Sequence, residues 1–194
     1  MATLQQVMAH VHGWPRSLHW NEFTRIQSSR EPPHLSECAA GFRLVATPLI
    51  PQGNGATINR NFRIEVFVTK DPTPGDTGTW VVIGSQTDDL LKHEQGHYDL
   101  AGLAAREYAR ELLMLRDEGP LDPTLIRDRV KAMNDQIVSE LALMNDAYDD
   151  PILGTDHGVS RIQDRWNIFI PGHLKTFLEP DISWIEDLTV ILSG

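Results

Sequence analysis

The amino-acid sequence predicts an α+β fold, in which a small and mainly antiparallel sheet packs on two long antiparallel helices. Three observations predict this class. Apolar and polar residues alternate in stretches before residue 85, which is the pattern of half-buried strands. After residue 85, apolar residues recur at steps of three and four, which is the pattern of amphipathic helices. The 194 residues are 41% hydrophobic and contain no linker-like tract, so we expect a single domain spanning residues 1–194.

Three strands are expected in the first part of the chain. Residues 42–46 and, more clearly, residues 62–68 place apolar side chains at every second position. Residues 79–83 form a β-branched and aromatic run, which could be a covered strand or an exposed edge strand that pairs with an extended peptide. A short element that packs on the body is expected at residues 18–23. The stretch between the first two strands is predicted to be a loop, because it holds Pro48, Pro51, Gly53 and Gly55.

Two long helices are expected after the strands. Ser85 or Thr87 can cap the first helix, and Gly119-Pro120 ends it after about 30 residues. The second helix has Asp122 as its cap and Pro123 as its first residue, and it ends at residues 149–151. The connection is short, so the second helix is expected to run antiparallel to the first.

The composition excludes several classes of partner. Lys and Arg number 17 against 27 Asp and Glu, and the net charge of −10 would repel the phosphates of nucleic acids. The same charge disfavours electrostatic attachment to a membrane, and no apolar run approaches the roughly 18 residues of a spanning helix. Cys38 is the only cysteine, so neither an internal disulfide nor a cysteine metal cluster is expected, and we predict a small buried hydrophobe.

Residues 93–97 read His-Glu-Gln-Gly-His and lie inside the first predicted helix. Histidines four positions apart share one helix face, so the imidazoles of His93 and His97 can bind one metal ion. Zinc with neutral nitrogen ligands and one open position lowers the pKa of a bound water to about 7. Glu94 lies beside the pair and can take the proton of that water as a general base. The motif therefore predicts Zn²⁺ as the cofactor, and the alternative is two ordinary helix histidines paired with carboxylates.

Catalytic zinc usually has three protein ligands, so a third must come from elsewhere in the chain. Asp99 is expected to point away from the metal, because it follows His97 by only two positions on the helix. We predict His157 as the third ligand, since Gly154 and Gly158 allow a tight loop that aims this side chain at the two helical imidazoles.

Further side chains near the end of the second helix could take part. Glu140 and Asp156 are the alternative third ligands, and Asp149 or Asp156 could orient the ring of a ligand histidine. Tyr148 could donate its hydroxyl to a tetrahedral intermediate, or it could be a core tyrosine. His173 could stabilise an oxyanion if the tail folds over the cleft, or it could be a surface residue.

Several motifs together resemble a known bacterial family. They are His-Glu-Gln-Gly-His-Tyr-Asp-Leu at residues 93–100, Tyr-Asp at 148–149, Thr-Asp-His-Gly at 155–158 and, more weakly, Trp-Asn-Glu-Phe at 20–23, Ala-Ala at 39–40 and Trp-Val at 80–81. The stretch from about Leu18 to His157 resembles a family that is catalogued as a domain of unknown function and described as predicted secreted zinc-dependent proteases. The resemblance implies a zincin-like fold, metallopeptidase activity and a secreted or periplasmic location.

The residues and the resemblance together predict a zinc metallopeptidase that cleaves peptide bonds in a peptide or protein substrate. The predicted metal ligands are His93, His97 and His157, and the predicted catalytic residues are Glu94 and Tyr148. The alternative is a zinc-binding structural or interaction module without turnover. The first seven residues show no basic region followed by an apolar stretch, so the sequence as given predicts no signal peptide and a cytoplasmic protein.

Overall fold

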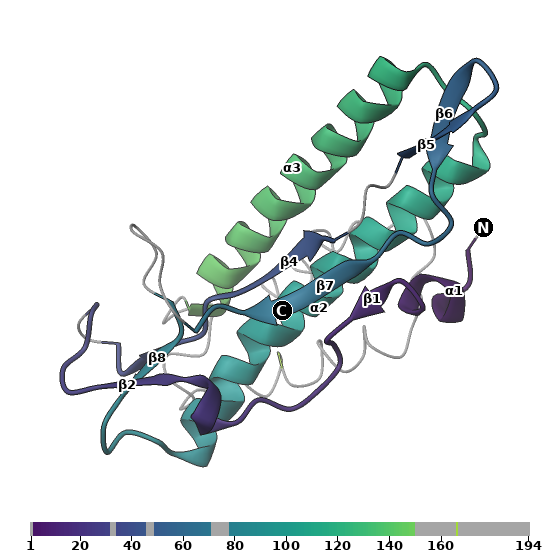
Figure 1. The fold of residues 1–194 in the computed structure, drawn as a ribbon. Helices are drawn as coiled ribbons and strands as arrows, with labels where there is room; N and C mark the ends of the chain where they lie inside the picture. Colours follow the sequence, from purple (N-terminus) through teal and green to yellow (C-terminus); the bar gives the residue numbers. More distant parts are fainter. Residues whose placement is uncertain (1, 32–33, 46–48, 71–77, 150–165, 167–194) are drawn as a thin grey trace, which may run out of the picture.

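The computed structural model describes residues 2–31, 34–45, 49–70, 78–149 and 166. Its largest elements are α2 (Asp88–Asp117) and α3 (Pro123–Asp149), which lie side by side and run in opposite directions (Figure 1). The shorter elements are α1 (Leu4–Met8), β1 (Val11–His12), the 3₁₀ turn η1 (Trp20–Glu22), β2 (Thr24–Ile26), β3 (Ser36–Glu37), β4 (Ala40–Leu44), β5 (Leu49–Gln52), β6 (Gly55–Ile58), β7 (Ile64–Val68) and β8 (Trp80–Val82). The class is therefore α+β, with small sheets and two long helices.

The ends of both long helices follow from the local sequence. Thr87 is the N-cap of α2, and its hydroxyl oxygen accepts a hydrogen bond from the backbone N–H of Leu90 at 3.2 Å. Gly119, with φ of 92°, takes the left-handed conformation that follows the end of α2. Asp122 accepts hydrogen bonds from two backbone N–H groups of the first turn of α3, which begins at Pro123. The predicted helices and their antiparallel course are confirmed.

Within the described residues, the strands form three small sheets rather than one. In the first sheet the central strand is β7, which pairs in parallel with β1 and antiparallel with β4. In the second sheet the central strand is β8, which pairs in parallel with β2 and antiparallel with β3. The predicted mainly antiparallel pairing is confirmed, since β3–β8, β4–β7 and β5–β6 are antiparallel. The parallel partners β1 and β2 were not predicted, because strands of two and three residues are too short to show alternation. Of the alternatives for residues 79–83, the covered strand is correct, since Trp80 and Val81 are fully buried.

Residues 49–58 form the β5–β6 hairpin, where the sequence predicts a loop. Gly53, with φ of 59°, lies in the tight turn between the two strands. Ala56 and Leu121 then exchange backbone hydrogen bonds of 2.9 Å, which join β6 to the α2–α3 connection. A side chain at Gly55 would meet the Leu121 carbonyl oxygen at 2.6 Å. The glycines that suggested an irregular loop therefore allow a tight turn and a close backbone approach.

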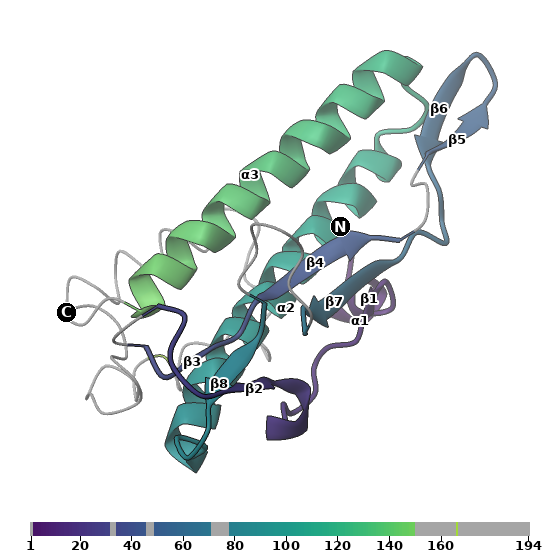
Figure 2. The ribbon, with the colours of Figure 1, turned by 60° about the vertical axis from the view of Figure 1, so that its left-hand side comes forward.

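Helix α2 lies at the centre of the core. The β1–β7–β4 sheet lies along it, and the β2–β8–β3 sheet lies near its first turns (Figure 2). Trp14 packs flat against α2 at Gly102, where a Cβ atom would come within 2.1 Å of the indole. Cys38 is buried and free, and burial raises its thiol pKa well above the usual value, as expected of a small hydrophobe. No helix among the described residues has both the length and the apolar character needed to cross a bilayer.

Candidate metal centre

The first turns of α2 and the last residue of α3 meet at one place. His93 and His97 lie one turn apart on α2, and both are buried. Because α3 runs back along α2 for 27 residues, its last residue, Asp149, reaches the level of these two histidines. The side chain of Asp149 keeps 39% of its surface exposed, so the cluster is open to solvent on that side.

The three side chains present their donor atoms to one another. His93 Nε2 and His97 Nε2 are 3.3 Å apart, and Asp149 Oδ1 lies 3.2 Å from the first and 2.9 Å from the second. A tetrahedral zinc ion with bonds of 2.0–2.1 Å would space its ligand atoms roughly 3.3–3.4 Å apart. Two imidazole nitrogens and a carboxylate oxygen also form a common donor set for catalytic zinc. His93, His97 and Asp149 therefore fit a single metal ion.

Asn145 fixes the ring of His97. Its side-chain oxygen lies 2.8 Å from His97 Nδ1, so the neutral ring donates its Nδ1 proton there and leaves the Nε2 lone pair directed toward Asp149 and His93. Asn145 precedes Asp149 by four residues on α3, and the two side chains therefore share one helix face. Such a partner sets both the tautomer and the orientation of a metal-binding imidazole.

Tyr148 packs on the other histidine. Its ring stacks on His93 at a centroid distance of 4.9 Å, and its hydroxyl donates to the backbone carbonyl of His93 at 3.1 Å. Trp166 also contacts Tyr148, edge-on, at a centroid distance of 5.2 Å. The structure thus gives Tyr148 the core role that the sequence left open, with the hydroxyl directed at the α2 backbone.

Gly96 explains how Tyr148 comes so close. A Cβ atom on Gly96 would lie 2.1 Å from the Tyr148 hydroxyl oxygen and 2.3 Å from its Cζ atom. The glycine inside the His-Glu-Gln-Gly-His motif therefore makes the space in which the end of α3 docks on α2, and this docking carries Asp149 to the histidines.

Glu94 is the most buried acid of the site. Only 1% of its surface is exposed, and its Oε1 accepts a hydrogen bond of 2.5 Å from the Ser36 hydroxyl. Its Oε2 has no hydrogen-bond partner within the part of the chain that the structure describes. Burial raises the pKa of Glu94 to about 7, against the opposing effects of His97 and Ser36.

The charges of the cluster are strongly coupled. Burial lowers the pKa of His97, but the hydrogen bond and the charge of Asp149 outweigh this and raise it to about 9. Burial alone would raise the pKa of Asp149, whereas hydrogen bonds with His93 and His97 hold it well below its usual range. Without a metal ion, a proton on His97 therefore supplies the positive charge that the Asp149 carboxylate requires.

The other predicted site residues fall into two groups. Glu140 lies elsewhere on α3: it accepts a hydrogen bond of 2.9 Å from Gln136, and its charge acts on Glu107, ten residues beyond His97 on α2. Asp99 points away from the cluster as predicted and accepts a hydrogen bond from the Trp14 indole at 2.9 Å. His157, Asp156 and His173 lie outside the described residues, so their predicted roles stay predictions.

Sequence reasoning gave Asp149 a supporting role and did not identify Asn145 or Ser36. The spacing of Asn145 and Asp149 was visible in the sequence, but their place opposite the histidines depends on how far α3 runs along α2. Ser36 could not be recognised from the sequence, because its strand is only two residues long and shows no alternation of apolar and polar residues.

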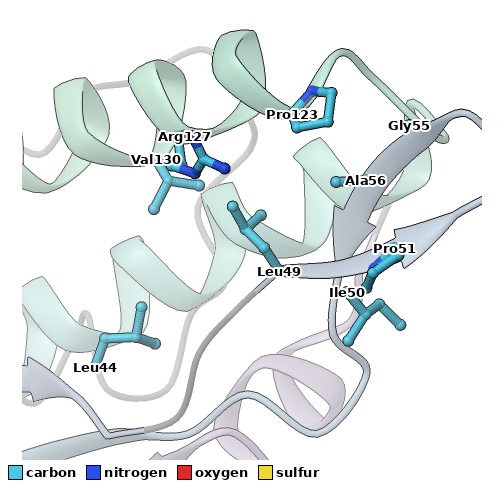
Figure 3. A pocket seen from close by; sticks show the side chains of 9 residues that line it. All are labelled: Leu44, Leu49, Ile50, Pro51, Gly55, Ala56, Pro123, Arg127 and Val130. Atoms are coloured by element: carbon cyan, nitrogen blue, oxygen red, sulfur yellow. The ribbon is translucent and has the colours of Figure 1, made fainter.

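An apolar cavity of about 520 Å³ lies at the opposite end of the helix pair, beside the β5–β6 hairpin (Figure 3). It is lined by Leu44, Leu49, Ile50, Pro51, Gly55, Ala56, Pro123, Arg127 and Val130. This lining holds no histidine or carboxylate, so the cavity is separate from the metal centre.

Comparison with known proteins gives one partial match to a family model. No curated protein and no solved structure matches the chain. The model of a bacterial protein family of unknown function, DUF922, matches residues 68–158, a span that contains α2, α3 and the residues of the metal centre.

Proposed function

We propose that this protein is a zinc-dependent hydrolase, and specifically a metallopeptidase. His93, His97 and Asp149 would hold the zinc ion, and Glu94 would be the general base. The observation that carries the proposal is the convergence of three donor atoms at ligand spacing beside a buried carboxyl group. The peptide substrate class is supported by the resemblance of residues 93–100 and 155–158 to predicted zinc-dependent proteases.

Bound zinc would supply a Lewis acid that polarises a carbonyl group and makes a water molecule more acidic. The residues of the chain would orient the metal ligands and transfer the proton. Asn145 and Asp149 keep the His97 ring oriented, and the packing of Tyr148 keeps that of His93. Glu94 would take a proton from the attacking water at Oε2 and return it to the leaving amine. A pKa raised by burial to about 7 suits a group that must accept and then release a proton near neutral pH.

Glu94→Gln tests the proposal. The purified wild-type protein is expected to contain one zinc ion per chain, which metal analysis measures, and a peptide-library digest supplies a cleaved sequence. Glu94→Gln should retain zinc and lose about 10²- to 10⁴-fold in turnover, because an amide cannot take the proton.

Glu140→Gln is the matched control, since it makes the same chemical change away from the cluster and should leave both zinc and turnover unchanged. Zinc without any Glu94-dependent cleavage would instead support the binding module without turnover. Iron in place of zinc would contradict a zinc hydrolase, because two histidines and one carboxylate also suit iron oxygenases.

A further inference from the structure

Ser36 connects the second sheet to the candidate base. It is the first residue of β3, only 3% of its surface is exposed, and its hydroxyl donates to Glu94 Oε1 at 2.5 Å. A hydrogen bond to a charged carboxylate at this distance is among the stronger ones in proteins. Ser36 takes no part in the contacts that join the donor atoms of His93, His97 and Asp149.

The backbone of Ser36 is held firmly in place. Ser36 pairs with Val81, and Glu37 pairs with Trp80, on the central strand β8. The next side chain, Glu37, points the other way and accepts a hydrogen bond from the Trp80 indole at 2.7 Å. Because Trp80 and Val81 are fully buried, β3 cannot shift without disturbing the core of this sheet. The Ser36 hydroxyl is therefore a fixed donor.

The two oxygens of Glu94 have different environments. Oε1 is occupied by Ser36, whereas Oε2 is buried and has no hydrogen-bond partner in the described part of the chain. A free carboxylate can rotate about its last bond and exchange its two oxygens. The Ser36 hydrogen bond opposes that rotation and keeps the same oxygen unoccupied.

We infer that Ser36 is a positioning residue for the base: by holding Glu94 Oε1, it leaves Oε2 as the oxygen that exchanges protons with a ligand of the metal centre. This inference rests on the proposed function of Glu94. It adds that the orientation of the base is set from the β2–β8–β3 sheet and not from the metal-binding helices.

Binding of acetohydroxamic acid to the zinc-loaded protein tests the inference without a known substrate. This acid binds zinc as its anion, and Glu94 is the neighbouring base that would take up the proton it releases. Ser36→Ala should weaken acetohydroxamate binding about tenfold, because it removes the hydrogen bond that orients Glu94. Ser36→Thr keeps the hydroxyl and should restore most of the affinity. Calorimetry measures this binding, and competition with a chelator should give the same zinc affinity for all three proteins.

Two further variants separate the possible outcomes. Ser85→Ala, in the loop before α2, is the matched control and should bind zinc and acetohydroxamate as the wild type does. Glu94→Gln should weaken acetohydroxamate binding at least as much as Ser36→Ala. If Glu94→Gln weakens binding and Ser36→Ala does not, the role of Ser36 is refuted while the proposed function stands.

Other results are equally decisive. If neither Glu94→Gln nor Ser36→Ala weakens binding, or if the wild type binds no zinc, the proposed function fails and the inference fails with it. A loss in Ser36→Thr equal to that in Ser36→Ala would show that the hydroxyl is not responsible. Thermal unfolding of each variant confirms that the fold is retained.

Discussion

Asp149 is the residue on which the chemistry of the centre depends most. A single oxygen of this carboxylate lies within 3.2 Å of both imidazoles, so it balances their charge when protons are bound and would complete the donor set of the proposed zinc ion. Its position is determined by neighbours that bind no metal: Tyr148 docks against Gly96, and Asn145 fixes His97. The site is thus built from the α3 side as much as from the motif on α2.

Substitutions at the end of α3 should therefore change zinc affinity in a graded way. Asp149→Ala removes a donor atom and should lower affinity by more than the roughly 10- to 100-fold expected for Asn145→Ala, which only frees the His97 ring. Asp146→Ala, an exposed acid on the same turn, is the control and should have no effect.

Chelator competition measures all three variants, with His157→Ala beside them. If His157→Ala abolishes binding while Asp149→Ala does not, the third ligand is His157 and the carboxylate has only the supporting role that the sequence suggested.

At the scale of elements, the helices were predictable and the sheets largely were not. Both long helices carry their own caps and an apolar period that persists for 27 to 30 residues, so local sequence determines their ends. The strands are two to five residues long, and the parallel pairs join segments more than 50 residues apart, such as Val11 with Ile64. Nothing local encodes such a pairing. The motif histidines were predictable because they lie on a helix, whereas Ser36 and Asp149 depend on tertiary packing.

The contact between α2 and α3 can be tested at Gly96. Alanine is the better helix former by about 1 kcal/mol, so Gly96→Ala would stabilise an isolated helix. Here the added methyl group would lie within 2.3 Å of the Tyr148 ring and hydroxyl, and such overpacking costs about 1–3 kcal/mol. We expect a lower melting temperature for the metal-free protein and weaker zinc binding, because Asp149 moves with Tyr148. A melting temperature equal to or above that of the wild type would contradict the close packing.

At the scale of the whole molecule, the candidate metal centre joins parts of the chain that fold as separate elements. The proposed ligands come from α2 and α3, and the hydroxyl that hydrogen-bonds the proposed base comes from the β2–β8–β3 sheet. Protonation and metal binding at this one place should therefore affect the stability of the entire fold. The two effects should depend on pH in opposite directions, since a proton and a metal ion compete for the same nitrogen of His97.

Raising the pH should destabilise the metal-free protein and strengthen zinc binding. Asp149 raises the pKa of His97 to about 9, above the value of about 6.5 in an unfolded chain. The pair therefore stabilises the fold fully below about pH 6.5, and this contribution is lost as the pH rises through about 9. Zinc requires a neutral imidazole, so it displaces one proton at pH 7, and its affinity should rise about tenfold per pH unit from pH 7 toward 9. Thermal unfolding with chelator and with buffered zinc, at pH 7 and 8.5, measures both effects. In Asp149→Asn the pKa of His97 should fall, so stability and zinc affinity should both change less between pH 7 and 8.5. If both change as much in the variant as in the wild type, the His97–Asp149 pair does not control the site.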